Sequence, residues 1–326
     1  MKHQIFATRP MPQRVLDFLS PHCDVQEPDE DVPVPPEDLA RICREQKIEG
    51  LVVAGGSIPA EVIREAAQLR VVASCSVGYD HINLEECTKR GILVTNTAGS
   101  LDDTTADLAF ALLLAAARRL GEAERFLRDG QWQHWKFKML WGADVHHKTL
   151  GIYGFGNIGR VMARRGSGFS MRILYHSRHR VPQAVERELG AEYRDRETLI
   201  RESDFLSLHV PLTPETHHMI AEREFGWMKT SAFLINTARG PVVDEEALVT
   251  ALKAGRLAGA GLDVFEREPK VHPELLKMDN VVLLPHIGSA TEETRTRMAM
   301  QAASNLLAVF DGKRPPNLIN TEALKV

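Results

Sequence analysis

Three residues near the end of the chain are of types that could hold a carboxylate and transfer a proton. They are Arg239, Glu268 and His286, and each follows a short apolar run that predicts a buried strand. In open α/β sheets, ligands bind just beyond the carboxyl ends of the strands. We therefore expect all three side chains to converge on a cleft between two domains.

Each residue has a distinct role if the reaction is hydride transfer to a carbonyl carbon. Arg239 can hold a 2-oxo acid through a bidentate contact with its carboxylate. His286 can protonate the carbonyl oxygen as general acid, and Glu268, bound to the other ring nitrogen, would orient the imidazole. Taken singly, each also has a structural alternative: a core histidine, a surface arginine and a loop carboxylate.

A glycine turn between two apolar runs predicts a dinucleotide site. The stretch TLGIYGFGNIGR has G-x-G-x-x-G spacing, and it predicts a strand, a helix to about Gly168 and a second strand at Met171–Tyr175. The glycines allow a tight turn, close approach of a pyrophosphate and close helix packing, and the helix N-terminus attracts phosphate. The candidate residues are Gly154, Phe155, Gly156, Asn157, Ile158 and Gly159.

The end of the second strand indicates which dinucleotide binds. It reads His-Ser-Arg-His-Arg, with no carboxylate before Glu186 to bind a ribose 2′-hydroxyl. Ser177, Arg178 and Arg180 suit the 2′-phosphate of NADP, so we expect NADP(H) to be preferred, with NAD(H) possible. The alternative is a basic surface turn.

Alternating strands and helices run through the first hundred residues, and the pattern predicts a doubly wound α/β domain. We expect Glu27–Asp38, rich in prolines and acids, to be a loop. A long helix at Ala106–Leu120 should lead into the cofactor domain, and a final helix at Ala290–Phe310 should return to the first. The expected strands are Ile5–Thr8, Leu51–Ala54, Val71–Ser74, Ile92–Asn96, Leu150–Tyr153, Ala191–Tyr193, Phe205–Val210, Ala232–Asn236, Ala258–Val264 and Val281–Leu284.

These elements predict an α/β fold with two doubly wound parallel-sheet domains. A Rossmann cofactor domain, 101–289, would be inserted into a flavodoxin-like substrate domain built from 1–100 and 290–326. A length of 326 residues suits two domains.

Composition argues against several other classes. The net charge of −4 shows no basic bias toward nucleic acid, and four scattered cysteines fit a reducing compartment. The most apolar run, Leu108–Ala117, is about half of the ~20 residues that a membrane span needs. The histidine pairs lack a third ligand, so no metal is expected. We expect a soluble, cytoplasmic protein.

The segment from Gly130 to His147 holds three of the four tryptophans. Because exposed tryptophans are costly, the segment should pack either against a partner subunit or onto its own domain.

Several separated motifs together resemble the D-isomer-specific 2-hydroxyacid dehydrogenases, and among them most resemble the glyoxylate/hydroxypyruvate reductases. The motifs are SVGYDHIN, GFGNIG, HVPLTPET, NTARGPVVDEEAL, GLDVFEREP and LLPHIGSAT, in family order. The resemblance implies that Arg239, Glu268 and His286 are catalytic. It also implies that the N–H groups of Val77 and Gly78 bind the substrate carboxylate.

The same resemblance extends the cofactor site and implies a homodimer, with Trp141 as candidate for a residue that reaches the neighbouring active site. It implies reduction of glyoxylate and hydroxypyruvate. A larger acid such as 2-ketogluconate, or a dinucleotide-sensing corepressor, remains as an alternative. The further cofactor residues are Val210, Pro211, Thr216, Thr237, Ala238, Asp263 and Gly288.

Overall fold

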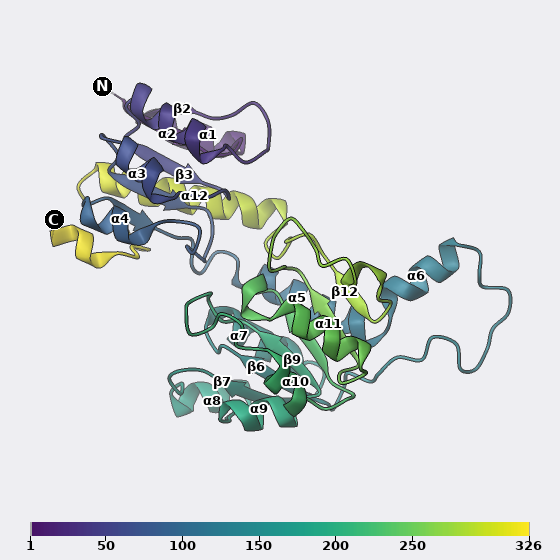
Figure 1. Cartoon of the computed structure of the whole chain (residues 1–326). Coiled ribbons are helices and arrows are strands. Elements are labelled where there is room, and N and C mark those ends of the chain that lie inside the picture. The colour runs from purple at the N-terminus through teal and green to yellow at the C-terminus, as the bar shows by residue number, and fades with distance from the viewer. Residues whose placement is uncertain (1, 326) are drawn as a thin grey trace. The chain divides into compact units, whose positions relative to one another are not determined.

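A computed structural model describes residues 2–325 and divides them into two compact units. Unit 1 contains the residues up to Leu101 together with those from Ser289 onward, and unit 2 is the continuous stretch Asp102–Gly288. Figure 1 shows the course of the chain through both units. No helix in residues 2–325 is long and apolar enough to cross a membrane.

Unit 1 is built on a five-stranded parallel sheet with the order β2-β1-β3-β4-β5. This is the order of flavodoxin-like folds. Ile5 pairs with Gly50, and Gly50 pairs with Val71, so the central strands are in contact along their length. The strands are β1 His3–Ala7, β2 Cys23–Gln26, β3 Gly50–Val53, β4 Val71–Ser74 and β5 Leu93–Thr95.

Helices cover both faces of this sheet. One apolar cluster includes Leu39 and Val62 from α2 and α3, and the other includes Ala302 and Leu306 from α12. The last long helix of the chain therefore completes the core of the first domain (Figure 1). The helices are α1 Gln13–Leu19, α2 Pro36–Glu45, α3 Ala60–Glu65, α4 Leu84–Lys89, α12 Glu292–Phe310 and the 3₁₀ turn η3 Thr321–Lys325.

Strand β2 and helix α2 were not predicted. Strand β2 lies just before the expected loop Glu27–Asp38, and the end of that loop, Pro36–Asp38, forms the first turn of α2. Proline is well suited to the first helical position, where its missing N–H is not needed, and the acids there favour the helix dipole.

Unit 2 is built on a seven-stranded parallel sheet with the order β12-β11-β10-β9-β6-β7-β8. The order reverses between β6 and β9, which is the position where such sheets bind dinucleotides. The predicted fold class, two doubly wound parallel sheets with a Rossmann unit, is confirmed. The strands are β6 Thr149–Tyr153, β7 Arg172–His176, β8 Ala191–Tyr193, β9 Phe205–Leu208, β10 Phe233–Asn236, β11 Gly259–Leu262 and β12 Val281–Leu283.

The helices of unit 2 lie on both faces of its sheet. On one face Phe110 of α5 and Val161 of α7 share an apolar cluster, and on the other Phe225 of α10 packs with Leu248 of α11. The helices are α5 Asp102–Ala117, α6 Leu120–Arg128, α7 Asn157–Ser167, α8 Gln183–Leu189, α9 Arg196–Glu202, α10 Glu222–Trp227 and α11 Glu245–Lys253, with 3₁₀ turns η1 Gly240–Val242 and η2 Leu275–Lys277.

The helix expected at Ala106–Leu120 differs from the observed one at both ends. Helix α5 begins earlier, at Asp102, whose carboxylate suits a helix N-terminus. It ends at Ala117, because the Ala117 carbonyl accepts the N–H of Ala143 at 2.8 Å and Arg119 takes φ of 55°. Helix α6 then leads away from the rest of unit 2 (Figure 1).

Candidate active site

The glycine turn between β6 and α7 has three glycines that are required for three different reasons. Gly154 has φ of 97°, and a Cβ there would lie 2.5 Å from the His209 carbonyl oxygen. A Cβ on Gly159 would lie 2.2 Å from the Gly154 oxygen, so this glycine lets the helix pack on the turn. A Cβ on Gly156 would meet nothing within 4 Å, which leaves room for a ligand at the backbone.

Helix α7 begins directly after this turn and has no side-chain cap. Its N-cap is Gly156, so its first N–H groups are open to an anionic ligand. Phe155 is buried and stacks on Tyr175 at a ring distance of 4.1 Å, so only its backbone faces the turn. Asn157 is exposed and Ile158 half-buried at the helix start. The turn therefore fits the pyrophosphate of a dinucleotide.

The basic residues after β7 are not equivalent. Arg180 donates two hydrogen bonds to Glu186, at 2.7 and 2.9 Å, and these bonds, together with the Tyr175 hydroxyl, lower the pKa of Glu186 to about 2. Ser177 donates to the His179 carbonyl at 2.6 Å. Arg178 is exposed. The pKa of Glu215 is lowered mainly by a hydrogen bond from Thr213, and the positive charge of Arg178 adds to this effect.

A compact turn follows β9. The Thr216 hydroxyl donates to the Pro211 carbonyl at 2.6 Å and accepts the Thr213 N–H at 2.8 Å, and Val210 is half-buried at the start of the turn. Just before it, the His209 ring lies 2.8 Å from the Ser207 hydroxyl. Burial lowers the pKa of His209 to about 4, so the ring is neutral at pH 7.

Two buried polar atoms near the ends of β10 and β11 have no hydrogen-bond partner among the described residues. They are the Thr237 hydroxyl and Oδ2 of Asp263, whose Oδ1 accepts the Ile287 N–H at 2.8 Å. Burial raises the pKa of Asp263. A Cβ on Gly288 would lie 3.2 Å from Oδ2, so the glycine keeps that side open. Unpaired buried atoms of this kind fit a polar ligand such as a carboxamide.

The three residues expected to do chemistry come together in unit 2. His286 Nδ1 lies 2.8 Å from Glu268 Oε2, and Glu268 Oε1 accepts the Phe265 N–H at 3.0 Å. Burial opposes ionisation of Glu268, but the His286 hydrogen bond and charge, the Phe265 N–H and the positive charge of Arg239 outweigh it and lower its pKa. The Glu268 carboxylate therefore stays charged beside His286 and Arg239.

The backbone fixes the approach of these side chains. Asn236, the last residue of β10, accepts the Ala238 N–H and donates to the Arg239 carbonyl, each at 3.0 Å, and so folds the turn that presents Arg239. His286 follows β12, and its N–H bonds to the Asp263 carbonyl at 2.9 Å. Its side chain is half exposed, so Nε2 can reach a ligand.

The predicted carboxylate-binding turn lies in unit 1, directly after β4. The Val77 carbonyl accepts from Asn96 at 2.9 Å, and the Gly78 carbonyl accepts from the Ser76 hydroxyl at 2.6 Å. These bonds fix the orientation of the peptide groups in the turn. Because β4 is parallel to its neighbours, the turn lies at the carboxyl edge of the sheet.

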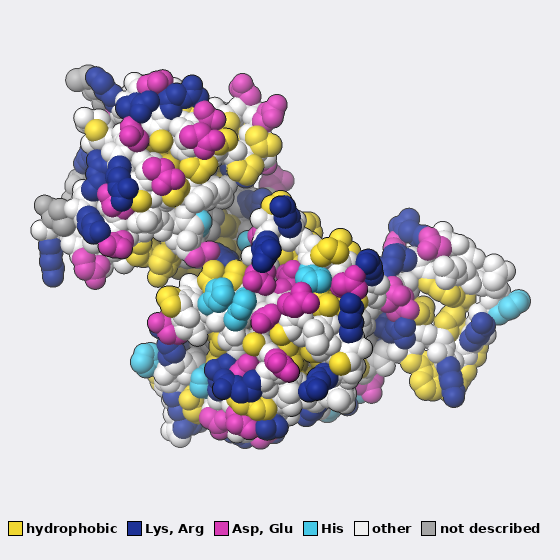
Figure 2. All heavy atoms as spheres, in the orientation of Figure 1, with side chains coloured by type: hydrophobic (Ala, Val, Ile, Leu, Met, Phe, Trp, Pro, Cys, Tyr) yellow, Lys and Arg dark blue, Asp and Glu magenta, His cyan; other side chains and the backbone are white. Residues whose placement is uncertain are grey.

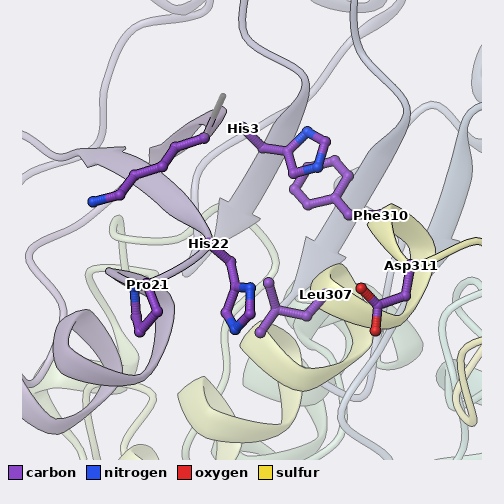
Figure 3. A pocket seen from close by; sticks show the side chains of 7 residues that line it. His3, Pro21, His22, Leu307, Phe310 and Asp311 are labelled. Atoms are coloured by element: carbon purple, nitrogen blue, oxygen red, sulfur yellow. The ribbon is translucent and has the colours of Figure 1, made fainter.

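A separate small pocket lies at the opposite, amino-terminal end of the strands of that sheet, where β1 begins (Figure 3). His3, Pro21 and His22 line it together with Phe310 and Asp311 from the end of α12. The His3 ring stacks on Phe310 at 4.0 Å and bonds to Glu49 at 2.9 Å. These contacts tie the start of the chain to its last long helix, and the pocket is not part of the ligand-binding edge.

Sequence reasoning missed the contacts behind these residues. The Ser207–His209 contact, the Arg180–Glu186 pair and a bond between His218 and Glu266 were not predicted. The signal that could have found His209 is a histidine directly after the buried strand β9. No cluster of His, Cys, Asp or Glu within residues 2–325 could hold a metal ion.

A glycine turn at the switch point of an open parallel sheet, with an acid–base pair at the same edge, defines an NAD(P)-binding oxidoreductase. The model of the family described as "D-isomer specific 2-hydroxyacid dehydrogenase, NAD binding domain" matches residues 110–288. The chain belongs to this family, as the motifs predicted, and is an NAD(P)-dependent D-2-hydroxyacid dehydrogenase.

Relatives match the chain over nearly its full length. Proteins named glyoxylate reductase from Thermococcus litoralis and Korarchaeum cryptofilum are 50% and 51% identical, over 99% and 100% of this chain and 98% of each relative. A solved structure of an NADPH-dependent glyoxylate/hydroxypyruvate reductase from Sinorhizobium meliloti, in complex with NADP and malonate, is also similar. It is 33% identical with a TM-score of 0.88, over 99% of this chain and 98% of that one.

Proposed function

We propose that the protein is an NADPH-preferring reductase of small 2-oxo acids, converting glyoxylate to glycolate and hydroxypyruvate to D-glycerate. The observation that carries the proposal is the cluster in which His286 meets Glu268 beside the positive charge of Arg239. The names of the relatives support glyoxylate as a substrate.

In this reaction the Arg239 guanidinium holds the substrate carboxylate. A reduced nicotinamide, when bound, supplies the hydride to the carbonyl carbon. His286 donates the proton from Nε2 to the carbonyl oxygen, which becomes the hydroxyl of the product. Glu268 on Nδ1 fixes the ring and balances its charge. The proton then returns to His286 from solvent, because the ring is half exposed.

The cofactor would bind along the edge of unit 2. The turn at Gly154–Gly159 would hold the pyrophosphate, and the unpaired Thr237 and Asp263 oxygens would meet the nicotinamide carboxamide. Arg178 is the best candidate for the 2′-phosphate because Arg180 is engaged by Glu186. We expect NADH to be accepted more weakly. The structure with NADP among the relatives supports this preference.

Unit 1 is the proposed substrate domain. The turn at Val77 and Gly78 would supply N–H groups to the substrate carboxylate, an assignment that rests on the resemblance of SVGYDHIN to the family motif.

We also propose a homodimer formed through the arm, by which we mean residues 120–147. Helix α6 has no buried residue, and Trp135 and Phe137 are 72% and 73% exposed. Figure 2 shows apolar side chains gathered on this projection. These two aromatic side chains thus do not pack onto their own unit, although Val145 near the end of the arm does, and aromatic groups of this kind are enriched in interfaces. A second copy of the chain would cover them.

The function is tested by measuring the loss of reduced nicotinamide with glyoxylate, hydroxypyruvate and 2-ketogluconate, each with NADPH and with NADH. We expect turnover of the first two acids and a higher kcat/KM with NADPH. His286→Asn serves as the matched control and should lose on the order of 10²-fold or more in kcat. Preference for 2-ketogluconate would replace the substrate assignment. NADPH binding without turnover of any acid would favour a dinucleotide-sensing protein.

A further inference from the structure

The loop that carries Glu268 is held tightly against the segment that carries Arg239. A Cβ on Gly240 would lie 1.8 Å from the Phe265 carbonyl oxygen, so only glycine allows the two backbones to come this close. A displacement of one segment must therefore displace the other. The relative position of Arg239 and Glu268 depends on this contact.

Two glutamates join the two segments through reciprocal hydrogen bonds between side chain and backbone. The Glu245 carboxylate accepts the Glu266 N–H and the His272 N–H, both at 3.1 Å. In return the Glu266 carboxylate accepts the Glu245 N–H at 3.4 Å, at the first residue of α11. The loop from Phe265 to His272 is thus attached to the start of α11 at several points.

His218 connects a third segment to these two. Its Nε2 lies 3.0 Å from Glu266 Oε1, and its own N–H bonds to the Pro241 carbonyl at 2.8 Å. Ile220 and Val243 form a parallel bridge beside it, which fixes the backbone on which the ring stands. The His218 side chain is two-thirds buried.

The surroundings of His218 are acidic on one side. Asp244 Oδ2 lies 3.9 Å from Nδ1, and the exposed His217 ring stacks on His218 at 4.1 Å. The ring of His218 therefore bonds to the loop that carries Glu268 through Glu266, while the His218 backbone is held by Pro241.

We propose that His218 is a positioning residue: by holding Glu266, it fixes the loop so that Glu268, two residues further on, meets His286 and Arg239. This inference rests on the proposed function of that cluster. Glu268 is held from its own loop as well, through the Phe265 N–H at 3.0 Å, so its carboxylate moves when the loop moves.

The test compares His218→Leu, which removes the bond to Glu266, with His218→Gln, whose amide can restore it. His217→Gln is the matched control, because that ring is exposed and adjacent. In His218→Leu we expect kcat to fall about tenfold with KM within about threefold, while the Gln variant recovers most of the rate. The control should behave as wild type.

A pH profile separates positioning from a general loss of structure. Glu268 is kept ionised by its hydrogen bonds with His286 and Phe265 and by the positive charge of Arg239, so loosening the loop should raise its pKa. The acid limb of kcat/KM should then move to higher pH by about half a unit in His218→Leu. Should the limb stay in place while activity and melting temperature fall together, His218 is only structural and the proposal is wrong.

One measurement needs no substrate. The carboxyl carbon of Glu268 can be titrated by NMR in the whole protein and assigned through its loss in Glu268→Gln. An unchanged titration in His218→Leu would overturn the positioning role even if the wild type reduces no 2-oxo acid, whereas absent turnover alone contradicts only the proposed function. If His218→Leu does not fold, Glu266→Gln keeps the shape of the loop and provides the same comparison.

Discussion

The Arg180 guanidinium and the Glu186 carboxylate form an ion pair with two hydrogen bonds, at 2.7 and 2.9 Å, six residues apart on the edge of unit 2. Glu186 also accepts the Tyr175 hydroxyl at 2.7 Å. The pair occupies one of the two arginines that the sequence offered to a 2′-phosphate. It leaves Arg178 as the more available one.

This difference predicts unequal effects on cofactor choice. Arg178→Glu should raise KM for NADPH at least tenfold, because an acid repels the 2′-phosphate, while kcat/KM with NADH is kept or improved. Arg180→Ala should change the NADPH to NADH ratio less than threefold. Steady-state kinetics with both cofactors checks this. Equal effects of the two substitutions would contradict the assignment.

Substitutions in the glycine turn should separate the affinity for the cofactor from the stability of the protein. Gly156→Ala adds a Cβ into open space at an ordinary φ of −75°, so the melting temperature should stay near wild type. Binding of both cofactors should weaken at least tenfold, since the methyl group blocks approach to the backbone. Gly159→Ala, whose Cβ would lie 2.2 Å from the Gly154 oxygen, should also lower the melting temperature. Calorimetric titration and thermal melts give both quantities.

The planar guanidinium of Arg239 should be replaceable neither by alanine nor by the ammonium group of lysine. We expect Arg239→Ala to lower kcat/KM for glyoxylate by on the order of 10²-fold, and Arg239→Lys to recover little, because an ammonium cannot form the bidentate contact. NADPH affinity, measured by fluorescence, should be nearly unchanged. A kcat/KM within a few-fold of wild type in the alanine variant would remove Arg239 from the substrate site.

The arm predicts an oligomer that depends on its aromatic side chains. The double substitution Trp135→Ser with Phe137→Ser should convert a dimer to a monomer in sedimentation velocity without changing the circular dichroism spectrum. Leu276→Ser is the control, because Leu276 is 66% exposed but lies outside the arm. A wild-type protein that sediments as a monomer would exclude this interface.

The desolvated, half-buried His209 ring predicts a loss of stability in mild acid. Its pKa is lowered from 6.5 to about 4, so on unfolding the ring takes up a proton that the folded protein excludes. The free energy of unfolding should therefore fall as pH drops from 6.5 to about 4, by on the order of 2 kcal/mol from this residue.

His209→Gln keeps a group that can bond to Ser207 and should flatten that dependence. Urea unfolding at pH 7 and pH 4.5 measures it, with the exposed His146→Gln as control. If the difference between the two pH values is the same in wild type and His209→Gln, the ring does not contribute.

Much of the sheet architecture could be predicted because buried parallel strands are short runs of Val, Ile and Leu between clear turn residues. Strand β2 was missed because Cys23–Gln26 alternates polar residues at the edge of its sheet. Helix α2 was missed because its first turn, Pro36–Asp38, looks like the loop before it. The break after Ala117 has no Gly or Pro to mark it, and it is set by the distant contact with Ala143.

The main residues of the candidate site could be predicted because strand ends in a parallel sheet lie at one edge, whatever the rest of the chain does. Their supporting partners could not. The Arg180–Glu186 pair joins the turn after β7 to helix α8, and the His218–Glu266 bond joins groups that are 48 positions apart in the sequence. Local pattern carries no information on which of several acids a base will meet.

Unit 1 is completed only by the last part of the chain, and this sets the order in which the two units can fold during synthesis. Ala302, Ala303 and Leu306 of α12 pack against Ile5, Val52 and Val71 in one apolar cluster. On the ribosome, Asp102–Gly288 emerges as a continuous stretch before α12 exists, so it can fold first. The N-terminal strands must wait with one apolar face uncovered, and a nascent chain stalled before residue 292 is the form most in need of a chaperone.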